Sequence, residues 1–176
     1  MVERKGWPIQ TIVVTPAKVK SFLDTPAIYQ SIVDEKEERY RSLREQATKT
    51  TTTLSVTPAG GGQDRNAMLA ALADADRDFA IWQHRLWEMD ARVEDFLTSA
   101  IMTTPLRKCL LYQRYRKRLK WDQVLLVLAE LRKEEGKEPI SKRQMFYEHL
   151  KALEDCSDWV NLSGKFLGDI IFDDKI

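Results

Sequence analysis

The chain has 176 residues, of which 43% are hydrophobic and 31% charged, so it can bury a core and is not disordered throughout. Seven glycines and six prolines are too few for a fold of many short strands, and two cysteines exclude a disulfide scaffold. No apolar run approaches the roughly 20 residues of a membrane span, and the first residues lack the apolar stretch of a signal peptide. We therefore predict a cytoplasmic protein with no membrane partner.

The near-neutral net charge of +1 hides an uneven distribution along the chain. Residues 106–153 carry 13 basic and 6 acidic side chains, a net charge of +7. The flanking segments 1–105 and 154–176 are acidic, with net charges of −2 and −4. A basic block of this size is typical of a nucleic-acid contact surface, although a merely solvated basic surface would have the same composition.

Residues 1–25 are predicted to form an N-terminal arm and a short helix. The β-branched run Ile9–Val14 suits either an edge strand or an extended arm. Thr15-Pro16 then predicts a helix start, because threonine caps helices and proline suits the first turn, and Thr25-Pro26 repeats this signal. We expect one helix to about Leu23 and a second over 26–47, with this heptad seam: Tyr29, Val33, Lys36, Tyr40, Leu43 and Ala47.

A flexible linker is predicted at residues 48–66, which contain six threonines and three consecutive glycines. After it, ten apolar positions from Met68 to Ala100 follow a 4-3 heptad repeat and indicate one long helix. Because the preceding helix is expected to be shorter, part of this seam would stay uncovered. We therefore predict that residues 26–102 form an assembly domain, although an internal hairpin would use the same side chains. The predicted subunit contacts are Phe79, Trp82, Leu86, Met89 and Phe96.

Residues 104–154 are predicted to form a compact domain of three helices, at 106–118, 121–135 and 142–154. Gly136 and Pro139 separate the last two helices, and Ser141 with Gln144 forms a capping-box pattern at the start of the third. The predicted fold class is therefore all-α, with an N-terminal helical hairpin or coiled coil and a C-terminal three-helix helix-turn-helix domain.

The third helix of this domain is predicted to bury a face centred on Phe146, together with Met145, His149, Leu150 and Leu153. Its other face would then read bases in the DNA major groove, because arginine can bind guanine and glutamine can bind adenine. The predicted base-reading residues are Arg143, Gln144, Tyr147 and Lys151. The predicted phosphate contacts are Arg114, Arg116, Lys117, Lys120, Ser141 and Lys142.

Several short motifs carry a family resemblance. The pieces are Leu111-Tyr112-x-x-Tyr115, Leu119-x-Trp121-x-x-Val124 and Ser141-x-Arg143-Gln144-x-Phe146-x-x-His149, with Ala152-Leu153 after them. They resemble the C-terminal helix-turn-helix of the ArpU/RinA-type phage transcriptional regulators, a module similar to region 4 of bacterial sigma factors. The upstream order of a charged helix, a threonine-rich tract, Gly60–Gly62 and a long heptad helix is similar too.

This resemblance covers roughly residues 26–154. The sequence departs from the family pattern in the long connection at 129–140, in Glu148 on the last helix, and in both terminal segments. The resemblance implies activation of phage or prophage late genes. The acidic and hydrophobic tail 155–176 is expected either to pack on the domain as a short helix or to contact a protein such as the host RNA polymerase.

No catalytic activity, metal site or cofactor is predicted. His84 and His149 have no second ligand at metal-binding spacing, and Cys109 and Cys156 are isolated thiols. Gly60–Gly62 lacks the Lys-Ser/Thr of a phosphate-binding loop.

The predicted function is that of a homo-oligomeric transcriptional regulator that binds specific sequences of double-stranded DNA. Two alternatives stay open, a phage DNA-packaging protein of the small-terminase type and a non-catalytic coiled-coil adaptor.

Overall fold

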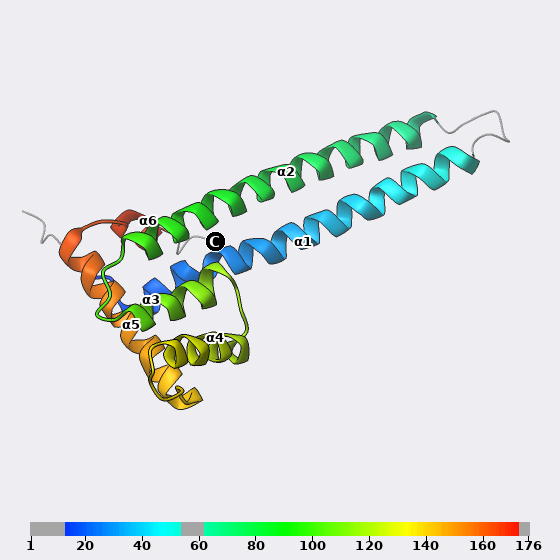
Figure 1. The fold of residues 1–176 in the computed structure, drawn as a ribbon. Coiled ribbons are helices and arrows are strands. Elements are labelled where there is room, and N and C mark those ends of the chain that lie inside the picture. Colours follow the sequence, from blue (N-terminus) through cyan, green and yellow to red (C-terminus); the bar gives the residue numbers. More distant parts are fainter. Residues whose placement is uncertain (1–12, 54–61, 173–176) are drawn as a thin grey trace, which may run out of the picture. The chain divides into compact units, whose positions relative to one another are not determined.

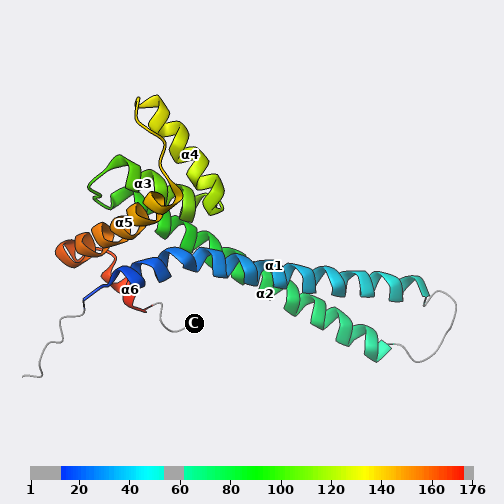
Figure 2. The same cartoon turned by 90° about the horizontal axis from the view of Figure 1, so that it is seen from below.

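The computed structural model describes residues 13–53 and 62–172, which form helices and, within these ranges, no strand (Figures 1 and 2). The predicted all-α class is confirmed. The helices are α1 (Pro16–Thr53), α2 (Gly62–Ser99), α3 (Pro105–Leu111), a π-helical turn η1 (Tyr112–Arg116), α4 (Trp121–Glu134), α5 (Lys142–Ser163) and α6 (Leu167–Phe172). The chain divides into two compact units, a hairpin unit of residues 23–95 and a basic unit that combines the chain up to residue 22 with everything from 96 onward.

The prediction of two separate helices before residue 48 is wrong, because α1 continues through Pro26. A proline inside a helix has no N–H to donate and costs about 3 kcal/mol in an exposed setting. Here the chain around it is buried, since Phe22, Leu23, Thr25 and Pro26 are all shielded from solvent. Burial of these side chains offsets the lost hydrogen bond and keeps the helix continuous.

The linker predicted at 48–66 is also shorter than expected, because α1 reaches Thr53 and α2 begins at Gly62. Residues 54–61, with two of the three glycines, lie outside the described residues. The threonines at the end of α1 remain helical despite their low propensity. The Thr48 hydroxyl donates to the Arg44 carbonyl at 2.9 Å, one helical turn back.

In the hairpin unit, α1 and α2 lie side by side and antiparallel (Figures 1 and 2). The two predicted heptad seams face each other. Tyr29 packs edge-on against Trp82, with ring centroids 5.5 Å apart, and Tyr40 stacks on Phe79 at 6.4 Å. The charged seam member Lys36 finds an acceptor, Asp78, at 3.5 Å.

The helix before the linker is not shorter than α2 as expected, because α1 and α2 have the same length of 38 residues. Of the predicted contact residues, Phe79 and Trp82 pack on α1 of the same chain. Met89 is buried, and Leu86 lines a groove with Val33. Phe96 belongs to the basic unit. The internal hairpin that the heptad pattern also allowed accounts for the contacts of Phe79 and Trp82, and a subunit contact at this seam stays a prediction.

The core of the basic unit is built around Phe96. Its ring contacts Phe22, Trp159 and Phe166 edge-on, with centroid distances of 5.4, 5.8 and 5.4 Å. Two of these partners lie in the segment predicted to be a tail. That segment begins as the continuation of α5, which runs past Glu154 to Ser163 and ends at Gly164, whose φ of 69° suits glycine.

The end of the N-terminal arm is held by a side chain of α5. Residues 1–12 lie outside the described residues, including most of the run expected to be a strand or arm, but Val14, just before α1, is buried. The Asn161 amide accepts a hydrogen bond from the Val14 N–H and donates one to the Val14 carbonyl, both at 2.9 Å. One side chain thus satisfies both backbone groups of a buried residue.

We expect Asn161→Ala to lower the free energy of unfolding by about 1–2 kcal/mol, because it leaves the buried Val14 N–H and carbonyl without partners. Urea unfolding followed by circular dichroism measures the change. The adjacent Leu162 is 88% exposed and serves as the control, since Leu162→Ala should change stability by less than about 0.5 kcal/mol. Equal effects of the two substitutions would contradict the role assigned to Asn161.

Candidate nucleic-acid interface

The first helix of the predicted DNA-binding domain is shorter than expected and ends in a wider turn. Thr104 caps α3, its hydroxyl accepting from the Arg107 N–H at 3.4 Å. The helix then widens into η1, where the Lys117 N–H bonds to the Tyr112 carbonyl five residues back. Arg118, with a left-handed φ of 55°, ends it. Leu110, Leu111 and Tyr115 are buried.

The connection between α4 and α5 spans residues 135–141 and leads back along α4 (Figure 2). The 14 residues of α4 are about 20 Å long at 1.5 Å per residue. Seven extended residues reach roughly 23 Å, so the connection can return over the whole helix. Lys142 accordingly pairs with Asp122 at 2.9 Å, and Phe146 contacts Trp121 at a centroid distance of 5.0 Å. Both helices thus begin at the same end of the domain, whereas a tight turn would join the end of one to the start of the next.

The face of α5 that packs on the unit matches the predicted one at Met145, His149 and Leu153 but not at Phe146 and Leu150. The buried residues of its first turns are Met145, His149, Ala152 and Leu153. Phe146 was expected at the centre of this face but is 38% exposed, and Leu150 is 59% exposed. His149 lies in the core as predicted, and there its Nε2 and the Tyr115 hydroxyl form a hydrogen bond of 2.8 Å. Trp121 packs edge-on against the same ring at 4.9 Å.

Three of the four predicted base-reading residues are exposed at the start of α5, namely Arg143, Gln144 and Tyr147. Within the described ranges no hydrogen bond or ion pair engages the side chains of Arg143 and Gln144. Lys151 differs, because it donates to Glu154 at 2.6 Å and lies over the Tyr147 ring. The hydrogen bond to Glu154 raises the pKa of Lys151.

The predicted phosphate contacts fall into two groups. Arg114 is mainly structural, because it donates to the Leu119 carbonyl at 2.9 Å and its guanidinium lies 4.8 Å from the Trp121 ring centroid. Ser141 caps α5, its hydroxyl accepting from the Gln144 N–H at 3.2 Å. Lys117, Lys120 and Lys142 are exposed. Arg116 is half-buried on η1. The exposed lysines gather where α4 and α5 begin.

An ion-pair cluster that the sequence did not reveal joins α3 to α5. Arg107 donates to Glu148 at 2.8 Å and to Asp155 at 3.0 Å, and all three side chains are at least four-fifths buried. The Thr103 N–H and hydroxyl also donate to Asp155, at 3.1 and 2.8 Å. Glu148 and Asp155 are seven residues apart and therefore share one face of α5. In the sequence, only this spacing of two acidic residues, together with the basic helix that precedes them, could have indicated the ion-pair cluster.

The cluster also gives a structural role to an acidic residue on a helix expected to meet DNA, because Glu148 is paired with Arg107. Its hydrogen bond to Glu148 raises the pKa of Arg107. Burial by itself would raise the pKa of Asp155, but the hydrogen bonds from Thr103 and Arg107 outweigh it and hold that pKa below the ordinary value.

Both cysteines are free thiols, Cys156 buried and Cys109 half-buried. Burial raises the pKa of Cys156 to about 12 and raises that of half-buried Cys109 in the same direction, which disfavours the thiolate. Across residues 13–53 and 62–172, no group of three or more histidine, cysteine or acidic side chains is placed to hold a metal ion.

Comparisons with models of protein families, with curated proteins and with solved structures give no match to this chain. The resemblance to the ArpU/RinA-type regulators therefore stays a prediction. None of the helices in the described ranges is both long and apolar enough to cross a membrane.

We expect Asp155→Asn to lower the free energy of unfolding by about 1–2 kcal/mol at neutral pH, because the amide cannot pair with the Arg107 charge. The pKa of Asp155 is lower in the folded protein than in the unfolded chain, where it is near 3.8. The charged carboxylate therefore stabilises the fold at every pH above 3.8, and this contribution is lost as the pH falls through the folded-state pKa. The difference between wild type and variant should accordingly be constant from pH 7 to about 5 and vanish in strong acid.

Urea titrations at several pH values measure this difference. Glu154→Gln is the matched control, because Glu154 is an exposed neighbour whose pair with Lys151 contributes little. A difference between wild type and Asp155→Asn that grows in acid would contradict the assignment.

Proposed function

We propose that the helices from Pro105 to Ser163 bind double-stranded DNA, and that the protein is a transcriptional regulator of the kind the ArpU/RinA resemblance implies. The observation that carries the proposal is the exposed start of α5, where Arg143 and Gln144 have no partner within the described ranges while Met145 and His149 anchor the opposite face. Arginine and glutamine are the side chains best suited to reading guanine and adenine edges.

The ends of two helices support the phosphate part of this proposal. The pair Lys142–Asp122 and the contact of Trp121 with Phe146 bring the first turns of α4 and α5 together. Unpaired N–H groups and the helix dipole favour anions at each of these ends. Lys117 and Lys120 add positive charge immediately before α4.

The proposed binding mode is a helix-turn-helix in which a long return connection replaces the usual tight turn. α5 enters the major groove with its first turns, and the lysines at the starts of α4 and α5 contact the backbone. Host RNA polymerase is proposed as a further partner on the resemblance alone. Ring-shaped assemblies with a preference for packaging-site DNA would favour the small-terminase alternative. No affinity for DNA at low salt would favour the adaptor.

We expect Arg143→Ala to weaken binding to a duplex selected from a random library by about 1–3 kcal/mol and to relax the preference at one base. Fluorescence anisotropy with selected and random duplexes measures both effects. Lys142→Ala is the matched control, because loss of a phosphate contact should weaken binding to both duplexes equally. If Arg143→Ala behaves like Lys142→Ala, Arg143 does not read sequence.

We also expect Lys120→Ala and Lys142→Ala each to reduce the slope of log binding constant against log salt concentration by about one unit, because each removes one phosphate contact. Lys133 is exposed near the other end of α4, and Lys133→Ala should leave the slope unchanged. A wild-type binding constant that does not depend on salt would exclude nucleic acid as the ligand.

A further inference from the structure

A second heptad stripe runs along the flank of α1, beside the seam that faces α2. Its members recur at spacings of four and three residues: Gln30, Asp34, Glu37, Arg41, Arg44 and Thr48. Each member of the stripe follows a seam residue by one position. At 100° per residue the stripe therefore lies slightly more than a quarter turn around the helix from the seam. Its first half is acidic and its second half is basic, and we call it the charged stripe.

A groove of about 400 Å³ runs beside the acidic half of the charged stripe. Asp34 and Glu37 line it from α1, and Gln83, Trp87 and Asp90 line it from α2. The two helices therefore present one shared face here. Trp87 is 67% exposed, although tryptophan is highly buried on average.

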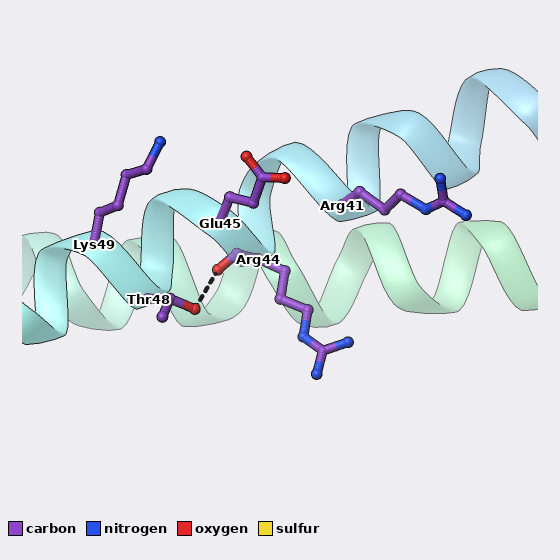
Figure 3. Close-up of a pocket in the computed structure, with 5 residues that line it drawn as sticks. All are labelled: Arg41, Arg44, Glu45, Thr48 and Lys49. Atoms are coloured by element: carbon purple, nitrogen blue, oxygen red, sulfur yellow. Dashed lines mark hydrogen bonds between the residues drawn. The ribbon is translucent and has the colours of Figure 1, made fainter.

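The basic half of the charged stripe has a hollow of its own, of about 360 Å³. Figure 3 shows its five lining residues, all on α1: Arg41, Arg44, Glu45, Thr48 and Lys49. Arg44 has no ion-pair partner within the described ranges, and Arg41 pairs only with Glu37 of its own stripe, at 2.5 Å. An acidic groove and a basic hollow thus lie on one flank of the same helix.

We propose that this face binds a second copy of the chain, in a two-fold contact that places the two α1 helices antiparallel. A two-fold axis level with residue 39 brings Asp34 opposite Arg44 of the partner subunit and Glu37 opposite Arg41 of the partner subunit. The same pairs recur on the other side of the axis, as a two-fold contact requires. A parallel pairing in register would instead oppose like charges, which is unfavourable.

The register of α2 fits the same axis. The pair Lys36–Asp78 and the stacked rings of Tyr40 and Phe79 put residue 78 level with residue 39. A two-fold at this level places Leu69 opposite Trp87 of the partner subunit. Both side chains are more than half exposed in the single chain, and the contact would bury them together.

Small residues on α2 allow the two hairpins to approach closely. The flank of α2 on this face follows its own heptad spacing: Leu69, Ala73, Asp76, Ala80, Gln83, Trp87 and Asp90. The alanines lie between the Leu69 and Trp87 anchors. One axis therefore satisfies charge on α1 and apolar burial on α2, which is the argument for a copy of this chain over an unrelated basic or acidic protein.

Two charge-reversal variants test the proposal in the full-length chain. Asp34→Arg with Glu37→Arg makes the whole stripe basic, and Arg41→Glu with Arg44→Glu makes it acidic. We expect sedimentation equilibrium to give the wild type twice the mass of the 20.5 kDa chain. Each double variant should dimerise at least about tenfold more weakly, because like charges then face each other.

Complementation distinguishes loss of the contact from general damage. An equimolar mixture of the two double variants should form a heterodimer, because a basic stripe then meets an acidic one. The quadruple variant, with acidic and basic halves exchanged, is again self-complementary and should dimerise like the wild type. Circular dichroism confirms that each variant keeps its helical content.

The matched control is Glu35→Arg with Asp74→Arg, which changes the net charge as much as the first double variant does. Both residues are exposed and lie outside the two stripes, so dimerisation should be unchanged. A wild type that sediments at the mass of one chain at high micromolar concentration would overturn the proposal. So would a dimer whose stability is the same in both double variants, or a mixture that fails to associate.

Discussion

Tyr115 and His149 meet at 2.8 Å in the interior of the basic unit, and this contact fixes how α5 is turned about its own axis. A buried imidazole needs a hydrogen-bond partner, and the phenol of η1 provides one. Once His149 faces inward, the 100° step of the helix turns Arg143 and Tyr147 outward. The same rotation leaves Leu150 in solvent. The proposed DNA-reading face therefore lies on the side of the helix opposite this buried polar pair and the apolar residues Met145, Ala152 and Leu153.

The second constraint is the return connection between α4 and α5. Because it is as long as α4 itself, it places the first turns of both helices at one end of the domain. The basic residues at 117, 120, 142 and 143 are scattered in sequence and converge there only through this path. The ion pairs of Arg107 with Glu148 and Asp155 then hold α5 against α3. The charge segregation seen in the sequence thus becomes a local concentration of charge.

The sequence predicted the features that depend on regular spacing. The heptads placed Tyr29, Tyr40, Phe79 and Trp82 in one seam, and Ser141 was correctly identified as a helix cap. The features set by distant contacts were missed. The inward position of His149 was predicted, but the exposure of Phe146 and Leu150 was not, and nothing near position 149 reveals the Tyr115 hydroxyl 34 residues earlier. Thr25-Pro26 has every local mark of a helix start, but burial of that stretch keeps α1 continuous. The ion-pair cluster of Arg107 joins α3, the residues just before it and α5, and no short sequence pattern predicts such a cluster.

Pro26 also has a consequence for how the chain opens. Proline carries no amide proton, so the hydrogen bond that residue 26 would donate to the Phe22 carbonyl is missing. The series of backbone hydrogen bonds along α1 is interrupted at this point. The division between the two units falls within a few residues of this gap. Helix unwinding spreads from one hydrogen bond to the next, and a missing bond is a place where it can stop. We therefore expect amide exchange to divide α1 into two cooperative segments, so that the hairpin can fray from its tip while the segment before Pro26 stays folded.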